Sequence, residues 1–360
     1  MRTIKVKTGQ PYDILVDGGL LTEVPKDLAD LSLGYRYAVI SDSRVADILG
    51  EDFVRMLEEN DLPADLFVFP EGEASKNMDT VVDIARRMVR AGYDRKCAVI
   101  ALGGGVTGDL AGFLASIYLR GVPYVQIPTT LLAQVDSSVG GKTGVDLPEG
   151  KNLLGTFYQP RRVYIDYGVL STLPLEHLRN GLAEVVKYGC ILSPDLFSFL
   201  EEKADRLLHY DADALEHIIC ESCRLKAEVV SRDEKEGHWR RVLNFGHTIG
   251  HAIEAAMNYQ MLHGFCVSIG MVAAARLSEA LDLARNISPR LEALLESLGL
   301  PIRLPEGLDI ESVMKFLRAD KKVWRGKLTF VLLKDLGEPV FYEEPPAEVL
   351  LETLASLKSS

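Results

Sequence analysis

The sequence has 360 residues, of which 47% are hydrophobic and 26% are charged, which is typical of a globular protein. This length predicts two domains with cores large enough to bury a site. The net charge of −12 argues against a general nucleic-acid or anionic-membrane binder, but it is compatible with a local cationic pocket for a small anion.

The first half of the chain alternates strand-like and helix-like segments. Helices are expected over residues 44–59 and 76–91 between the strands, and this alternation predicts a parallel sheet covered on both faces. The predicted strands are short and rich in β-branched and aromatic residues, and they cover residues 3–8, 12–17, 36–42, 65–70, 97–103, 124–128 and 162–166.

The pattern changes near Pro174, and long helical periods dominate from there. Only residues 327–333 and 338–343 resemble strands in this half. We therefore expect an α/β domain over residues 1–173 and a mainly helical domain over residues 174–360. The predicted helices cover residues 175–190, 212–231, 245–257 and 266–280.

The five cysteines are scattered, and the beginning of the sequence has no apolar signal core. Cys220 and Cys223 form a C-x-x-C pair, but they lie inside a predicted helix and no second pair accompanies them. Two half-buried helix thiols are therefore expected instead of a structural zinc site. Together these features predict a protein of the reducing cytoplasm.

A glycine turn follows the predicted strand 97–103 in "CAVIALGGGVTGDLAGFLA". Gly103, Gly105 and Gly108 satisfy G-x-G-x-x-G, in which glycines let the backbone approach a pyrophosphate and the next helix supplies N–H donors. The alternative is a turn that only packs a helix against a strand. The strand and helix around the motif favour a dinucleotide site.

This motif departs from the usual dinucleotide pattern in two ways. It does not lie in the first βαβ unit, and no acidic residue follows it by about twenty residues to hold a ribose. Asp42 ends an earlier strand, and Glu73 and Lys76 follow another. We therefore expect a rearranged nucleotide site at the carboxyl ends of the strands.

The stretch "VDSSVGGKTG", residues 135–144, ends like a phosphate-binding P-loop. A P-loop needs a glycine, four residues and then Gly-Lys-Ser/Thr, but Asp136 stands where the first glycine should be. A carboxylate there would point at the bound phosphate. The P-loop interpretation fails, yet Lys142 lies in a Gly/Ser loop and is expected to meet an anion.

The second half contains residues suited to a metal ion. His247 and His251 stand at i, i+4 on one helix face in "NFGHTIGHAIE", and His263 begins a later segment. Glu184 and Lys187 share one face of an otherwise apolar helix. A glutamate with two histidines fits catalytic zinc, although the spacing does not decide which two histidines bind. "HTIGH" lacks the glutamate of a zinc protease, and histidines satisfied by core hydrogen bonds are the alternative.

Cationic and amide side chains lie in several other loops and helix ends. Each taken singly is also explained as a solvated surface group, but together they suit a substrate with several negative charges. They are Arg120, Lys151, Asn152, Lys226, Arg240, Lys321 and Lys322.

Several long blocks of the chain resemble 3-dehydroquinate synthases, of the sugar phosphate cyclase superfamily, over nearly the whole length. The blocks are "GGGVTGDLAGF", "QIPTTLLAQVDSSVGGKTGVD", "GKNLLGTFYQP", "GLAEVVKYG", "NFGHTIGHAIE" and "LHG". The resemblance implies a homodimer with a Rossmann-like NAD-binding α/β domain and a mainly α-helical C-terminal domain that binds metal and substrate. It also implies zinc or cobalt as the metal.

The implied activity belongs to the shikimate pathway of aromatic amino acid biosynthesis. The substrate is 3-deoxy-D-arabino-heptulosonate 7-phosphate and the products are 3-dehydroquinate and phosphate. The implied steps are transient NAD-dependent oxidation, phosphate elimination, reduction and aldol cyclisation.

The same resemblance implies roles for individual residues. Glu184, His247 and His263 are the implied metal ligands, and His251 becomes a phosphate contact. The implied phosphate contacts also include Lys142, Asn152 and Asn244, with Arg120 contributed across the dimer interface. Lys226 and Arg240 are implied to hold the substrate carboxylate, and Asp136, Lys187 and Glu236 the hydroxyls near the metal. Either Lys321 or Lys322 faces the substrate.

The implied NAD contacts follow several of the predicted strands. They are Asp42, Glu71, Gly72, Glu73, Ala74, Ser75, Lys76, Gly104, Gly105, Val106, Thr107, Gly108, Asp109, Thr129, Thr130, Lys142, Lys151, Val169, Leu170, Ser171 and Thr172.

One position departs from the family pattern. After "LHG" the family usually carries glutamate, and this chain has Phe265, a change that is expected to alter the polarity around His263.

Three rival functions deserve comparison. 2-Deoxy-scyllo-inosose synthase shares NAD and zinc, but its substrate has no carboxylate for Lys226 and Arg240. An NAD/zinc polyol dehydrogenase of the glycerol dehydrogenase type needs fewer side chains that donate hydrogen bonds to a phosphate, and it releases NADH. A non-catalytic nucleotide sensor is disfavoured by the predicted metal ligands.

Overall fold

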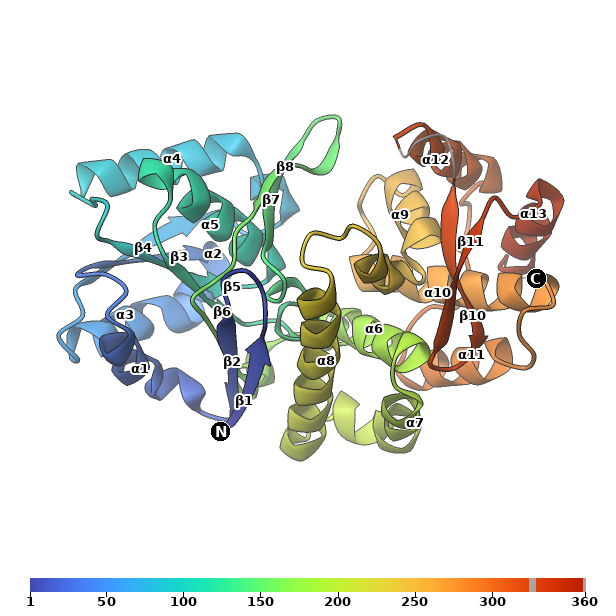
Figure 1. Cartoon of the computed structure of the whole chain (residues 1–360), viewed down its shortest axis with the longest axis horizontal. Helices are drawn as coiled ribbons and strands as arrows, with labels where there is room; N and C mark the ends of the chain where they lie inside the picture. The colour runs from blue at the N-terminus through green and yellow to red at the C-terminus, as the bar shows by residue number, and fades with distance from the viewer. Residues whose placement is uncertain (324–327, 359–360) are drawn as a thin grey trace. The chain divides into compact units, whose positions relative to one another are not determined.

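The computed structural model describes residues 1–323 and 328–358, without the side chains of residues 319–323 (Figure 1). The chain forms two compact units. The first unit comprises Met1–Leu173 and Leu215–Lys235, and the second comprises Pro174–Ala214 and Glu236–Ser360.

Helix α8 (Ala212–Arg232) contributes most of its length to the first unit. The thiol of Cys223 donates to the carbonyl of Gln134 at 3.2 Å, and the Lys226 ammonium lies 2.9 Å from Asp136 Oδ1. The predicted domains, 1–173 and 174–360, place this helix in the second domain. Those boundaries stay a prediction, and they differ from the compact units over residues 215–235.

A seven-stranded sheet organises the first unit, in the order β1-β2-β9-β6-β5-β3-β4. All neighbouring pairs from β2 to β4 are parallel, and the edge strand β1 pairs antiparallel with β2. The predicted parallel sheet is confirmed. Its strands are β1 (Arg2–Val6), β2 (Tyr12–Asp17), β3 (Tyr37–Asp42), β4 (Ala64–Phe69), β5 (Ala98–Gly103), β6 (Tyr124–Pro128) and β9 (Arg162–Asp166).

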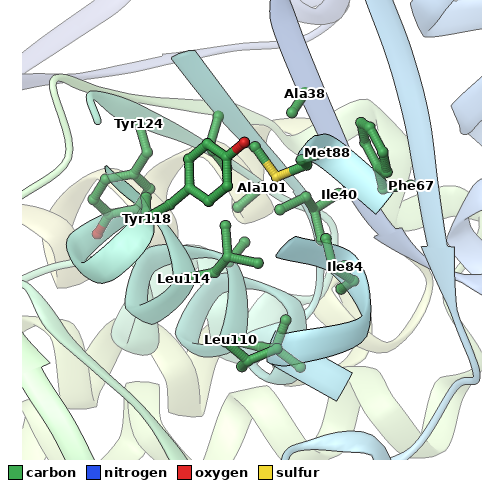
Figure 2. Packing of buried hydrophobic residues seen from close by; sticks show 14 of the residues in the cluster. Ala38, Ile40, Phe67, Ile84, Met88, Ala101, Leu110, Leu114, Tyr118 and Tyr124 are labelled. Carbon is green, nitrogen blue, oxygen red and sulfur yellow. The ribbon is translucent and has the colours of Figure 1, made fainter. Parts of the chain in front are cut away.

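Helices cover both faces of this sheet (Figure 1). Ala38 and Ile40 of β3 pack with side chains of α4 (Met78–Arg90) and α5 (Gly105–Ile117) on one face (Figure 2). Tyr37 of the same strand packs on the other face, in a cluster that includes residues of α1 (Val24–Leu31) and α3 (Glu51–Glu58). Since both faces are buried, strands such as β5 have a continuous apolar sequence instead of an alternating one.

Short helical segments connect the larger elements of the first unit. They are η1 (Leu20–Thr22), α2 (Ser43–Val45), η2 (Ala46–Gly50), η3 (Glu73–Ser75), η4 (Tyr118–Arg120), η5 (Ala133–Ser137) and η6 (Tyr167–Thr172).

A hairpin that the sequence did not predict projects from the first unit. Strands β7 (Lys142–Leu147) and β8 (Gly150–Phe157) pair antiparallel as a separate two-stranded sheet. Their sequences, "KTGVDL" and "GKNLLGTF", contain three glycines and few β-branched residues. Such a composition gives a weak strand signal, because glycine is disfavoured in strands.

The second unit is mainly helical, as predicted. Residues 180–191 of α6 and residues 266–275 of α10 are buried without interruption, so these two helices run through its interior. Its elements are α6 (Leu175–Ile191), α7 (Pro194–Leu208), η7 (Trp239–Asn244), α9 (His247–Ala256), α10 (His263–Ala280), α11 (Ser288–Ser297), α12 (Ile310–Val323), α13 (Ala347–Ser356) and the hairpin β10 (Thr329–Asp335) and β11 (Glu338–Glu343).

All five cysteines are free thiols, and Cys220 and Cys223 lie within α8 as expected. Over the part of the chain that the structure describes, no helix has both the length and the apolar character needed to cross a membrane.

Candidate functional site

The carboxyl ends of β3 and β5 are adjacent in the first unit. The chain continues from β3 to β4 on one side and from β5 to β6 on the other, which makes this point a topological switch. Open α/β sheets bind ligands at such points. Asp42 ends β3, Gly103 ends β5, and the hydroxyl of Thr107 donates to Asp42 Oδ2 at 3.2 Å. Two sequence signals for a nucleotide therefore meet here.

The glycine turn combines packing with an open helix end. A Cβ atom on Gly103 would lie 2.4 Å from Thr107 Oγ1, and one on Gly108 would lie 2.7 Å from Gln126 Oε1. Close packing of helix on strand therefore explains these two glycines. Gly104 is the N-cap of α5, and no side chain caps this helix. Its first-turn N–H groups are thus suited to an anion such as a pyrophosphate.

Lys76 ties the segment after β4 to α5 and to the β7–β8 hairpin. Its Nζ lies 2.7 Å from Asp109 Oδ2 and 2.6 Å from Asn152 Oδ1, and its carbonyl accepts from the Asp146 N–H at 2.8 Å. Burial alone would lower the pKa of Lys76, but the Asp109 and Glu73 carboxylates raise it. The buried ammonium therefore stays charged.

The other residues implied for NAD also follow carboxyl ends of parallel strands. Residues 71–76 follow β4, Thr129 and Thr130 follow β6, and residues 169–172 follow β9. Lys151 of the hairpin lies with its Nζ 3.5 Å from Glu73 Oε1. The topology brings these segments to one edge of the sheet, because parallel strands all end there. Their contacts with a nucleotide stay a prediction.

The "GGKT" stretch leads into a strand. Gly140 and Gly141 have φ angles of 102° and 69°, and Lys142 is the exposed first residue of β7. A P-loop lysine lies where a helix begins, so the rejection of a P-loop is confirmed. Asp136, in η5 just before this stretch, pairs with the buried Lys226 of α8. The structure therefore brings two predicted substrate contacts together.

Four predicted side chains converge in the second unit. The carboxylate of Glu184 is completely buried in α6, and its Oε1 lies 3.4 Å from His247 Nε2 and 3.5 Å from His263 Nε2. Lys187, also buried, forms an ion pair with the Glu184 carboxylate from the next turn of α6. A carboxylate oxygen and two imidazole nitrogens are the donor set that Zn²⁺ and Co²⁺ accept.

The three histidines also face one another. One ring nitrogen from each of His247, His251 and His263 lies within 4.8 Å of the other two. The geometry thus allows a set of three histidines as well as the set with Glu184. Both ligand sets, which the sequence pattern also left open, are therefore compatible with the geometry.

The two histidines nearest Glu184 have opposite pKa shifts. Burial lowers the pKa of His247 to about 3, despite the attraction of the Glu184 carboxylate. Burial would also lower the pKa of His263, but hydrogen bonds to Glu184 and Glu254 and their negative charges raise it to about 9. Of the two histidines beside Glu184, His263 is therefore the one that carries a positive charge near neutral pH in the metal-free protein.

The remaining predicted residues divide between the two units. Arg240 is buried in η7, Asn244 ends the same segment, and Glu236 precedes it with a φ of 58°. Arg120 is exposed in η4 of the first unit. The side chains of Lys321 and Lys322, which fall in α12, lie outside the described residues.

Two residues near the predicted site were missing from the sequence prediction. Asp146 accepts from the Asn152 N–H at 2.7 Å and so shapes the hairpin tip. Glu254 lies 3.4 Å from His263 Nδ1. The spacing of Glu254, seven residues after His247, is a signal that could have found it, whereas Asp146 has no comparable signal.

The chain matches two family models that together span most of its length. Residues 66–180 match the model described as 3-dehydroquinate synthase N-terminal, and residues 181–323 match 3-dehydroquinate synthase C-terminal. A curated 3-dehydroquinate synthase from Acidithiobacillus ferrooxidans is 47% identical over 357 residues, which cover 98% of both chains.

Solved structures of two sugar phosphate cyclases are also similar. A 2-deoxy-scyllo-inosose synthase complexed with carbaglucose-6-phosphate, NAD⁺ and Co²⁺ has a TM-score of 0.91 and 30% identity, covering 99% of this chain and 100% of that one. A 2-epi-5-epi-valiolone synthase from Streptomyces hygroscopicus with NAD⁺ and Zn²⁺ bound has a TM-score of 0.89 and 31% identity, covering 96% of both chains.

Binding of Zn²⁺ is expected to release a proton from His263. The metal-free imidazole has a pKa of about 9, so at pH 7.5 its Nε2 or Nδ1 proton must leave before the ring can coordinate. Affinity should rise about tenfold per pH unit below pH 9. Titration calorimetry in buffers of different ionisation enthalpy measures this proton, and His263→Gln is the control.

The same shift predicts how pH acts on the metal-free protein. His263 has an ordinary pKa of 6.5 and a folded value of about 9, so its stabilising charge is fully present below pH 6.5 and lost as the pH rises through 9. For the calorimetric experiment, Zn²⁺ binding at pH 7.5 without proton release would contradict a raised pKa of His263 and its coordination of the metal.

Proposed function

Because the chain belongs to the 3-dehydroquinate synthase family, we propose that its first unit binds NAD⁺ and that its second unit binds Zn²⁺ or Co²⁺ through Glu184, His247 and His263. The enzyme converts 3-deoxy-D-arabino-heptulosonate 7-phosphate to 3-dehydroquinate and phosphate in the shikimate pathway. Curated 3-dehydroquinate synthases with 40–47% identity over 93–99% of the chain support this activity.

One observation carries the metal assignment. Three side chains that are far apart in the sequence meet around Glu184 Oε1, at 3.4 Å from His247 Nε2 and 3.5 Å from His263 Nε2. Both solved sugar phosphate cyclases have NAD⁺ and a divalent cation bound, which supports the same pair of cofactors here. When bound, NAD⁺ reversibly accepts a hydride and the cation makes substrate hydroxyls more acidic.

The protein's own residues hold and orient the substrate. We assign Lys142 and Asn152 of the first unit, with Asn244 and His251 of the second, to the phosphate. Ammonium, amide and imidazole donors hold phosphate by charge-assisted hydrogen bonds and stabilise it as it leaves. Holding one substrate in a fixed orientation through several steps supplies much of the rate enhancement.

The carboxylate and the hydroxyls of the substrate need other partners. We assign Lys226 and Arg240 to the carboxylate, because both are buried cations in an otherwise acidic protein. Asp136, Lys187 and Glu236 are assigned to the hydroxyls. The ion pairs of Lys226 with Asp136 and of Lys187 with Glu184 orient these two ammonium groups.

A groove on the first unit supports a homodimer. Its volume is about 520 Å³, and α4, α5 and η4 line it mainly with apolar side chains. Val89, Ile117 and Leu119 in this groove are 60%, 42% and 36% exposed, which is typical of an interaction surface. Arg120 follows directly, with a φ of 75°. We infer that a second copy covers this groove and that Arg120 reaches the substrate phosphate of the other subunit.

A different sugar phosphate cyclase activity is the second candidate. The 2-deoxy-scyllo-inosose synthase has only 30% identity, against 47% for the 3-dehydroquinate synthase from Acidithiobacillus ferrooxidans. A solved structure described as a probable glycerol dehydrogenase from Sinorhizobium meliloti has a TM-score of 0.65 and 16% identity, which shows a shared fold alone.

The activity is tested with the heptulosonate phosphate, Zn²⁺ and substoichiometric NAD⁺. Phosphate and 3-dehydroquinate are expected in equal amounts over many turnovers, without net NADH, because the hydride returns to the substrate. Released phosphate is measured colorimetrically in the same reaction in which 3-dehydroquinate and the absorbance of NADH are followed. NADH that accumulates with product would instead favour a polyol dehydrogenase.

Substitution of Arg240 is expected to weaken carboxylate binding. Arg240→Ala should lower kcat/KM about 10–100-fold, since losing a hydrogen bond to a charged group costs about 1.5–3 kcal/mol. Arg240→Lys keeps the positive charge, so its kcat/KM should fall less than that of Arg240→Ala. The neighbouring Arg241→Ala is the matched control. An unchanged kcat/KM in folded Arg240→Ala would contradict the assignment of Arg240 to the substrate carboxylate.

The dimer is tested by placing charge in the groove. Val89→Asp with Ile117→Asp should weaken dimerisation by on the order of 100-fold, because burying unpaired carboxylates costs several kcal/mol. Sedimentation at several protein concentrations measures the association. Ile48→Asp, at a similarly exposed isoleucine of η2, is the control and should not change it. If the groove variant and the Ile48→Asp control had the same association constant, the proposed interface would be wrong.

A further inference from the structure

Glu254 lies on the metal-facing side of α9. His247, His251 and Glu254 stand at i, i+4 and i+7, which places all three on one face of this helix. The Glu254 side chain is 6% exposed. A carboxylate buried to this extent needs a hydrogen-bonding or charged partner, because removing it from water alone is costly.

The imidazole of His263 lies between two carboxylates. Glu184 Oε1 is 3.5 Å from its Nε2, and Glu254 Oε2 is 3.4 Å from its Nδ1. The two ring nitrogens point away from each other. Glu254 therefore contacts the edge of the ring opposite to the one that faces Glu184 and His247, and it is not placed as a further metal ligand.

His247 has the same arrangement with a different partner. Its Nδ1 lies 3.1 Å from the carbonyl oxygen of Phe245, and its Nε2 faces Glu184. A carbonyl oxygen only accepts hydrogen bonds, so Nδ1 carries the proton and Nε2 keeps its lone pair. Both predicted histidine ligands thus have Nδ1 occupied by an acceptor and Nε2 directed at the same carboxylate.

We propose that Glu254 is a positioning residue for the metal centre: its carboxylate accepts the Nδ1 proton of His263 and so presents the Nε2 lone pair to the cation. This inference rests on the metal ligands of the proposed function. Carboxylates behind metal-bound histidines fix the tautomer and orientation of the ring and increase its basicity. Glu254 acts through His263 and does not touch the substrate.

Metal affinity tests the proposal directly. Glu254→Ala should raise the dissociation constant for Zn²⁺, measured by competition with a chromogenic chelator, about 10–100-fold. Glu254→Gln keeps an acceptor oxygen and should lose less than about tenfold, so it rescues part of the affinity. In the Co²⁺-loaded protein, Glu254→Ala should shift the visible absorption bands, because the field of the ligands changes with the orientation of His263.

Glu279 provides the matched control. It is also a glutamate of the second unit, and its carboxylate accepts from Ile287 N, Ser288 N and the Ser288 hydroxyl at 2.7, 2.9 and 2.6 Å. Glu279→Ala should lower the melting temperature without changing Zn²⁺ affinity or the Co²⁺ spectrum. Melting temperatures of the metal-free variants separate loss of fold from loss of metal.

The outcomes distinguish this inference from the proposed function. If the parent protein binds Zn²⁺ and folded Glu254→Ala binds it equally well, the role of Glu254 is wrong and the metal centre stands. Equal losses in Glu254→Ala and Glu279→Ala would also overturn it, since general destabilisation would then explain both. If the parent protein does not bind Zn²⁺, both the proposed metal centre and the positioning role of Glu254 are wrong.

Discussion

A carboxylate with no exposed surface governs the structure of the second unit. Glu184 lies in the middle of a buried helix, where an unpaired charge would cost several kcal/mol. Lys187 neutralises it from the same helix, and His247 and His263 approach it from α9 and α10. The three helices must therefore pack so that cationic or polar groups surround the buried Glu184 carboxylate. A bound divalent cation would compensate the same negative charge.

The first unit solves a different problem, which is to bring short segments to one place. Its parallel strands end at one edge, so segments separated by more than a hundred residues, from Asp42 to Thr172, reach that edge by topology alone. Lys76 then joins three of the elements through Asp109 and Asn152. Separating these elements would leave the buried ammonium without its partners, so the network favours keeping them together.

Much of this could be predicted from the sequence because the signals are local. The strands of the main sheet other than β1 each contain an apolar run, β1 has alternating apolar and polar residues, and the predicted helices of the second unit have clear periods. The β7–β8 hairpin was missed because glycines weaken its strand signal and pairing across the hairpin stabilises it. Residues 215–235 read as an ordinary helix, and nothing local indicates with which unit a helix packs.

Residue types and shared faces follow from local sequence alone: a glycine turn follows a strand, and His247 and His251 lie on one side of a helix. The helical period converts such spacing directly into a shared face. Which of these groups meet depends on how the helices pack, and this packing brings Glu184 and His263 to His247 and places Glu254 next to His263. Distances between helices depend on packing among side chains remote in sequence, and a local pattern carries no information about them.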